Sequence, residues 1–255
     1  MRTELKTKSF QIEYTEKEIN SLVLWDNHCH SQFEMIGILE GDITILLEGT
    51  PYRVSQSQAV IIPPLAYHTI TANKGGSYRR LTALFEDEAL PHALRPYFIR
   101  KDTNIFIVQS AQLESLKRVC QEENPIFYES LAEALMTQVF YEALQSSPKS
   151  LAAEADEFLQ KAIGYIENHM GEKISLKELA THTSRSMSSL CHLFEEKMRV
   201  SPKQYILHKK LALANKLIEE GVPPTLAAAR IGYDNYSNFY RMYRKRYGIC
   251  PKSKK

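Results

Sequence analysis

The chain has 255 residues, of which 44% are hydrophobic and 24% are charged, and this composition argues against a largely disordered protein. Its length is sufficient for two domains with separate cores. The net charge of +2 conceals an asymmetry, because residues 1–150 carry 14 Lys and Arg against 19 Asp and Glu, whereas residues 151–255 carry 18 against 11. The basic C-terminal part therefore suits contact with nucleic-acid phosphates, and the acidic N-terminal part does not.

The targeting and cysteine patterns indicate an intracellular protein. The segment Met1–Lys6 lacks the apolar core of a signal peptide, and no later stretch is long enough to cross a bilayer. We therefore expect a cytoplasmic location and no membrane partner. The cysteines form no Cys-x-x-Cys pair, which argues against a zinc finger and favours unpaired thiols. They are Cys29, Cys120, Cys191 and Cys250.

Short apolar runs separated by turn residues predict strands between Ser9 and Phe85. Phe10, Ile12 and Tyr14 alternate with polar residues, as in a strand with one buried face. Further runs cover residues 22–24, 35–39, 43–47, 60–62 and 81–85, and turn signals lie at 40–42 and 73–76. Strands at this spacing predict an all-β domain, a small antiparallel barrel or jelly roll, over residues 1–108.

The hydrophobic period becomes helical after Ala111. One helix is predicted from Leu113, Leu116, Val119 and Cys120, and a second, beyond Asn124-Pro125, from Leu131, Leu135, Val139 and Leu144. This pair, within residues 109–145, can either pack on the β domain or form a dimer interface. The polar run Gln145–Ser150 predicts an interdomain linker at 146–152.

Residues 153–255 predict an all-α domain that begins with a helix over about 153–170. Ser175 and Glu178 form a Ser-x-x-Glu capping box, which predicts a short helix. Ser186 can cap the next helix, whose apolar face repeats at Leu190, Leu193, Phe194 and Met198. This is a helix-turn-helix pattern.

A longer helix follows, and then the pattern returns. Residues 201–204 form a second capping box with Pro at the first helical position, and Gly221 should end that helix. A short helix over 223–229, a turn at Gly232 and a cap at Asp234 lead to the last helix. It is predicted to bury Phe239, Met242, Tyr243 and Tyr247 and to end at Gly248. Two such units on one body can enter successive major grooves, roughly 34 Å apart.

Several short motifs carry a resemblance to a known family. They are Ile174–Ala180, Leu190–Phe194, Ser201-Pro202 with Tyr205, Gly232-Tyr233-Asp234 with Ser237-Asn238-Phe239, and Gly248–Pro251. Together they resemble the DNA-binding domain of the AraC/XylS, or arabinose-regulator, family of bacterial transcription factors. Arg199 stands where this family usually has Gly, and Lys210 stands where it usually has Arg.

The resemblance implies a transcription regulator, such as an activator, that binds promoter or operator DNA as a homodimer and acts on RNA polymerase. By this resemblance the base-reading positions of the first unit are Ser188, Cys191 and His192. In the second unit the matching positions are Tyr236, Ser237, Tyr240 and Arg241, with Arg244 and Lys245 behind them. Arg241 can form a bidentate contact with guanine, whereas Lys245 suits a phosphate.

A polar cluster is predicted inside the β domain. His28, His30 and Glu34 have the spacing of the first cupin motif, and His68 falls where the second ends. Their even spacing places the first three on one face of a strand, and His68 could join them from a neighbouring strand. Three interpretations remain open: a site for a small-molecule effector such as a sugar, a site for a divalent transition metal, or a structural hydrogen-bonded cluster.

The sequence therefore predicts a ligand-responsive transcription regulator with a cupin-like sensor at 1–108, a helical segment at 109–145 for dimerisation and coupling, and a DNA-binding domain at 153–255. It is expected to be no enzyme and to need no cofactor, apart from the metal that the cluster could hold. The alternative is a cupin-type metal-dependent enzyme with an accessory helical domain. That alternative leaves the paired helix-turn-helix units and the charge asymmetry unexplained.

Overall fold

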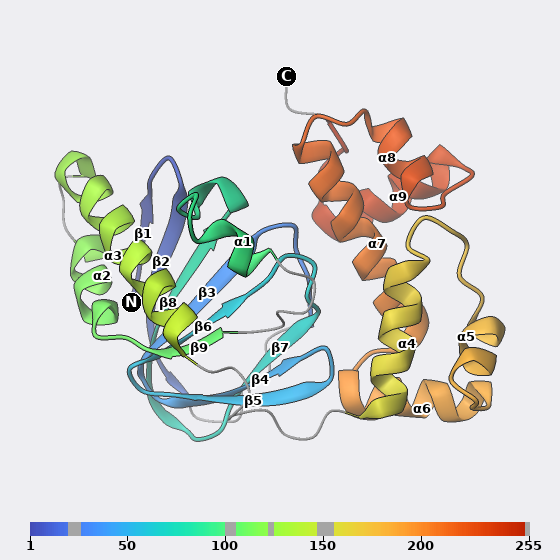
Figure 1. Ribbon diagram of the computed structural model, residues 1–255, viewed down its shortest axis with the longest axis horizontal. Helices are drawn as coiled ribbons and strands as arrows, with labels where there is room; N and C mark the ends of the chain where they lie inside the picture. Colours follow the sequence, from blue (N-terminus) through green and yellow to red (C-terminus); the bar gives the residue numbers. More distant parts are fainter. Residues whose placement is uncertain (20–26, 100–105, 122–124, 147–155, 253–255) are drawn as a thin grey trace. The chain divides into compact units, whose positions relative to one another are not determined.

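A computed structural model describes residues 1–19, 27–99, 106–121, 125–146 and 156–252 (Figure 1). The chain forms two compact units, of which one contains most of residues 1–153 and the other is built on residues 154–255. The strand predicted at 22–24 and residues 147–152 of the predicted linker lie outside the described residues. Among the described residues, no helix combines the length and apolar character needed to cross a bilayer.

The N-terminal unit contains two sheets. The larger has six strands in the order β1-β2-β8-β3-β6-β9, and the smaller has three in the order β5-β4-β7. The strands are β1 (Arg2–Lys6), β2 (Phe10–Ile19), β3 (Phe33–Glu40), β4 (Asp42–Leu47), β5 (Thr50–Ser55), β6 (Gln58–Ile62), β7 (His68–Ala72), β8 (Gly76–Phe85) and β9 (Phe106–Gln109). This confirms the all-β, jelly-roll-like prediction, but the described strands form two sheets and not a closed barrel.

One face of the larger sheet packs against two helices, α2 (Gln112–Gln121) and α3 (Pro125–Gln145), while the short helix α1 (Arg95–Phe98) follows β8 (Figure 1). Phe33 and Met35 of β3 belong to this core, together with Phe140 of α3. Because side chains alternate along a strand, Glu34 between them points to the opposite face. All three residues of β3 are buried, so this central strand has a covered surface on both sides.

The helix pair forms as predicted, but its buried positions are only partly those expected. Val139 and Phe140 are fully buried, whereas Leu131 is 45% exposed. The buried stripe of α3 runs instead through Ala132, Met136, Val139, Phe140 and Ala143. The apolar residues around α3 are too numerous for spacing alone to show which stripe faces the sheet.

The C-terminal unit is all α, as predicted. Its first part contains α4 (Glu157–Asn168), α5 (Leu176–His182) and α6 (Met187–Met198). Ser186 accepts a hydrogen bond from the Ser189 N–H and caps α6. Ser175 holds the N-cap position of α5, but its side chain makes no capping hydrogen bond. The predicted capping box with Glu178 is therefore wrong, although it marked the start of the helix correctly.

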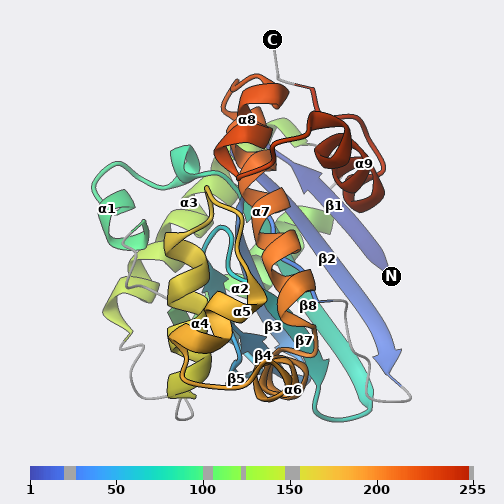
Figure 2. The ribbon, with the colours of Figure 1, turned by 90° about the vertical axis from the view of Figure 1, so that its right-hand side faces the viewer.

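The second part contains α7 (Pro202–Glu219), α8 (Pro224–Arg230) and α9 (Tyr236–Tyr247). The capping box of Ser201 and Gln204 is confirmed at the start of α7. Asn235, and not Asp234, caps α9, because its Oδ1 accepts the Asn238 N–H at 3.1 Å. Figure 2 shows α5 and α6 beside one end of α7, and α8 and α9 at its other end.

Helix α7 also ties the two helix-turn-helix units together through Lys210. Its ammonium donates to the carbonyl oxygens of Ile231, at 2.8 Å, and of Glu172. Burial lowers the pKa of Lys210. Gly232 follows Ile231 and lies against the same Glu172 carbonyl group. Its φ is +75°, and a Cβ on it would lie only 2.8 Å from that carbonyl group. A backbone crossing this tight admits only glycine.

Candidate functional site

The first candidate surface is the outer side of α6. Leu190, Leu193 and Phe194 are buried against the rest of the unit. Ser188 and His192 are exposed, and Cys191 is half-buried at the edge of the same face. The three residues predicted to read bases therefore lie on one side of one helix, where a ligand can reach Ser188 and His192.

The outer side of α9 offers a larger and more basic surface. Phe239 and Tyr243 are buried, whereas the predicted base-reading and phosphate-contacting side chains are mostly exposed: Tyr236, Ser237, Arg241, Arg244 and Lys245. Arg241 donates to Asn238 Oδ1 at 2.9 Å, which holds the guanidinium toward the N-terminal turn of the helix. Tyr240 is half-buried, with its hydroxyl 2.9 Å from Cys250 Sγ.

Arg185 is a candidate that the sequence patterns did not single out. It precedes the N-cap of α6, donates to Ser189 Oγ at 3.1 Å, and lies with its guanidinium carbon 4.0 Å from the centre of the Phe158 ring. This cation–π contact fixes a positive charge beside the exposed face of α6. A signal for it was present in the sequence, since it is a basic residue next to a predicted helix start.

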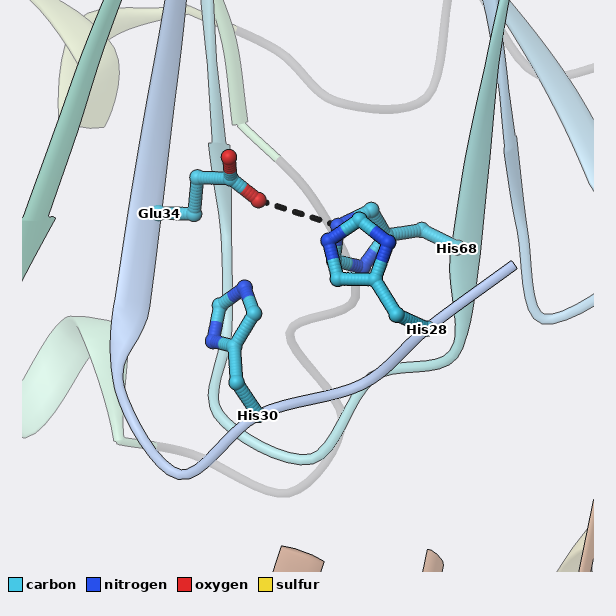
Figure 3. A group of neighbouring side chains, drawn as sticks. All are labelled: His28, His30, Glu34 and His68. Carbon is cyan, nitrogen blue, oxygen red and sulfur yellow. Dashed lines mark hydrogen bonds and ion pairs between the residues drawn. The ribbon is translucent and has the colours of Figure 1, made fainter. Parts of the chain in front are cut away.

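The second candidate site is the cluster predicted from the cupin-like spacing. His28, His30, Glu34 and His68 each contribute one ligand-type atom, and these atoms all lie within 4.8 Å of one another. Figure 3 shows the four side chains converging on one region. The geometric reason we gave for it is wrong in part, because β3 begins only at Phe33. His28 and His30 reach the cluster from the segment before that strand and not by strand alternation.

The best-defined contact in the cluster joins His68 to Glu34. His68 Nε2 lies 2.9 Å from Glu34 Oε2, and His68 Nδ1 lies 3.0 Å from the Ala66 carbonyl oxygen. The side chains are 0% and 10% exposed, respectively. His68 opens β7 of the smaller sheet and Glu34 lies on β3 of the larger one, so this pair connects the two sheets in the interior of the unit.

Two protein-family models match the chain, one in each half. A family model described as an AraC-like ligand binding domain matches residues 12–159, and a model described as a helix-turn-helix domain matches residues 179–254. The chain belongs to the AraC family of transcriptional regulators. The resemblance found in the sequence is thereby confirmed, and the chain is a regulator with a ligand-binding N-terminal domain and a helix-turn-helix DNA-binding domain.

Other regulators are similar along nearly the whole chain. The probable transcriptional regulator LumQ of Photobacterium leiognathi is 26% identical, over 97% of this chain and 96% of its own. The uncharacterized HTH-type regulator YobQ of Bacillus subtilis is 25% identical, over 90% and 88%. Among solved structures, ToxT of Vibrio cholerae aligns over 96% of both chains, with 12% identity and a TM-score of 0.46. The two sequence relatives are both named as transcriptional regulators, in agreement with the family.

Proposed function

We propose that α6 and α9 read DNA sequence from the major groove, with no enzymatic step in the protein's activity. The observation that carries this proposal is the repeated architecture of the C-terminal unit. In each half a short helix and a turn precede a capped helix that buries one apolar stripe and exposes polar side chains at matching positions. In α9 these include Arg241 and the basic last turn, with Arg244 and Lys245, a set suited to bases and phosphates.

We propose that the cluster of His28, His30, Glu34 and His68 is where the sensor recognises its effector. Imidazole and carboxylate groups together offer donors and acceptors to polar ligands such as sugar hydroxyls. Occupation of the cluster would then change the free energy of DNA binding, because a ligand shifts an equilibrium only through its different affinity for the two states. The regulated step is transcription by RNA polymerase in the cytoplasm.

We further propose that α3 forms the interface of a homodimer. Its outer face carries Leu131 and Tyr141, which are 45% and 56% exposed, beside polar residues such as Gln138. These two large apolar side chains, within three turns of one helix, would form the centre of a symmetric contact. A dimer would present two copies of the basic unit and raise avidity for a site with two halves.

A gel-shift experiment tests the DNA-reading proposal. The full-length protein should bind labelled DNA from the region next to its own gene, and so slow its migration in the gel, even in the presence of excess unrelated DNA. The double variant His192→Ala/Arg241→Ala should lose this specific retention, because each change removes a base-reading donor. Lys161→Ala, which removes an exposed charge from α4, is the matched control and should bind as the wild type does. Equal retention by all three proteins would refute the assignment.

Sedimentation of charged variants tests the dimer. Leu131→Glu and Tyr141→Glu should each shift the protein toward monomer, because a carboxylate in an apolar interface is costly to desolvate. Leu226 of α8 is also 45% exposed, so Leu226→Glu controls for the effect of adding a charge at an exposed apolar residue. A monomeric wild type, or a dimer that survives both changes in α3, would remove this interface.

A further inference from the structure

The C-terminal unit contains a groove of about 570 Å³ beside α7. Its walls come from the segment before α5, from one side of α7, and from the α8–α9 turn together with one side of α9. This volume lies within the range of ~300–1,000 Å³ that small-molecule sites occupy in proteins. Because the walls belong to both helix-turn-helix units, a molecule in the groove would touch both units at once.

The inner surface of the groove is mainly apolar. Two of its apolar residues lie on α7, one lies on α9, and the other two lie in the segments before α5 and α9. All five are half-buried: Ile174, Ile206, Leu207, Tyr233 and Met242. An apolar body placed in the groove would remove this surface from water, which is favourable.

The rim of the groove is mainly cationic. Lys173 and Lys203 are exposed there, and Asp234 is the one acidic residue among the described residues that line the groove. Lys210 also lines it, but this lysine is buried and its ammonium already donates to two backbone carbonyl oxygens. The two rim lysines are therefore the cations that a ligand can reach, and they complement a negative charge.

One wall of the groove continues into the base-reading side of α9. Asn235 and Asn238 both line the groove. Asn235 Oδ1 accepts the Asn238 N–H at 3.1 Å, and Asn238 Oδ1 accepts a hydrogen bond from the Arg241 guanidinium at 2.9 Å. A ligand that contacts these two amides would therefore act on the side chain that orients Arg241.

We propose that this groove binds a carboxylic acid with a compact apolar body, and that its occupation weakens DNA binding. The carboxylate lies at Lys173 and Lys203, and the apolar body covers Ile206 and Leu207. A bound anion lowers the positive potential with which the basic unit attracts phosphates.

This site is separate from the effector cluster of the N-terminal unit, so it goes beyond the proposed function. Binding of the acid does not depend on DNA. Only its effect on DNA affinity rests on the proposed reading of DNA by α6 and α9, and the two can be measured separately.

Titration of the full-length protein with biphenyl-4-carboxylate, without DNA, tests the site. In isothermal titration calorimetry the acid should bind saturably and roughly 2- to 20-fold more tightly than the neutral biphenyl-4-carboxamide, a gain that one or two exposed ion pairs supply. The double variant Lys173→Ala/Lys203→Ala changes only exposed side chains, so it should fold, and it should lose this preference for the acid. Ile206→Trp fills the groove with a larger side chain and should remove one equivalent of binding for both compounds.

Lys161→Ala/Lys177→Ala is the matched control, because it removes two exposed charges of the same unit that do not line the groove. It should bind the acid as the wild type does. Three results would each overturn the proposal: no saturable binding to the wild type, an acid bound no more tightly than the amide, or equal binding of the acid by the wild type and Ile206→Trp.

Fluorescence anisotropy with labelled DNA from the region next to the gene tests the effect on DNA. Saturating acid should lower the DNA affinity of the wild type but not that of Ile206→Trp, and the DNA should weaken acid binding by the same factor. Equal DNA affinity of the wild type with and without acid would overturn the regulatory part of the proposal. A protein that binds the acid but no specific DNA refutes the proposed function alone, whereas one that binds specific DNA but no acid refutes the groove site alone.

Discussion

At the scale of single residues, Arg241 and Lys245 are expected to play different parts on α9. Arg241 is exposed near the N-terminal turn, where Asn238 orients its guanidinium. Arg241→Ala should relax preference at one base pair by ~1–3 kcal/mol, because a bidentate contact with guanine is lost. Lys245→Ala should weaken binding to all sites alike. It should also make the slope of log affinity against log salt concentration shallower by about one unit, because one phosphate contact is lost. Binding of both variants to a panel of single-base operator variants measures the difference. Equal weakening of every site by both would make Arg241 a phosphate contact.

Asp42 should contribute stability that depends on pH. Hydrogen bonds from Arg53 are the main cause that holds its pKa below the ordinary value, and Asn73 adds another at 2.9 Å. A carboxyl group with a lower pKa in the folded state stabilises the fold above its unfolded pKa of ~3.9, and this stabilisation is lost as pH falls through the folded value. Asp42→Asn should therefore lower the free energy of unfolding by up to ~1 kcal/mol at neutral pH. Urea unfolding at a series of pH values should also show that the free energy of unfolding falls less steeply in acid than it does for the wild type. Arg53→Gln should weaken this acid dependence as well. If both variants lose stability in acid as steeply as the wild type does, the Asp42–Arg53 pair contributes nothing to stability.

At the scale of elements, the turn between α8 and α9 should tolerate no side chain at Gly232. A Cβ there would lie 2.8 Å from the Glu172 backbone, and φ is +75°. Gly221, after α7, also has positive φ, of +89°, but nothing lies within 4 Å of its would-be Cβ. Gly221→Ala should cost ~1–2 kcal/mol for the left-handed conformation, and Gly232→Ala should cost a further ~1–3 kcal/mol for the clash. Urea unfolding followed by far-UV circular dichroism compares them, and equal losses would mean that the Glu172 backbone moves aside easily.

The elements also show how far sequence reasoning reaches. Helical periodicity and the Ser186 and Ser201 caps located α6 and α7, because local hydrogen bonds decide where a helix begins. The cap of α9 was misplaced by one residue, since both Asp234 and Asn235 have side chains able to cap. Strands β1, β5, β7 and β9 have only four to six residues each, and they were missed because so short a segment shows little hydrophobic periodicity. The cluster of His28, His30, Glu34 and His68 was found from spacing, but the Ala66 carbonyl that orients His68 is a backbone group and leaves no sequence signal.

At the scale of the whole molecule, the C-terminal unit should bind DNA without the sensor. Residues 154–255 carry most of the basic excess and all the proposed base-reading residues. A fragment beginning at residue 154 should bind the operator more weakly than the full chain, because a dimer that engages two half-sites gains from effective concentration. Fluorescence anisotropy with one and with two half-sites measures the loss. A fragment that is folded but binds both DNAs as tightly as the full chain would show that α3 contributes no avidity.

The central claim is that one chain carries two base-reading helices on one body. Selection of DNA from a random pool by the full-length protein tests it most directly. The account predicts enriched sequences in which each half-site holds two conserved blocks centred about one helical turn, ~10 base pairs, apart. It also predicts that Arg241→Ala blurs one block and His192→Ala blurs the other. A single uninterrupted block affected by only one of these variants, or no enrichment over random DNA, would contradict the account.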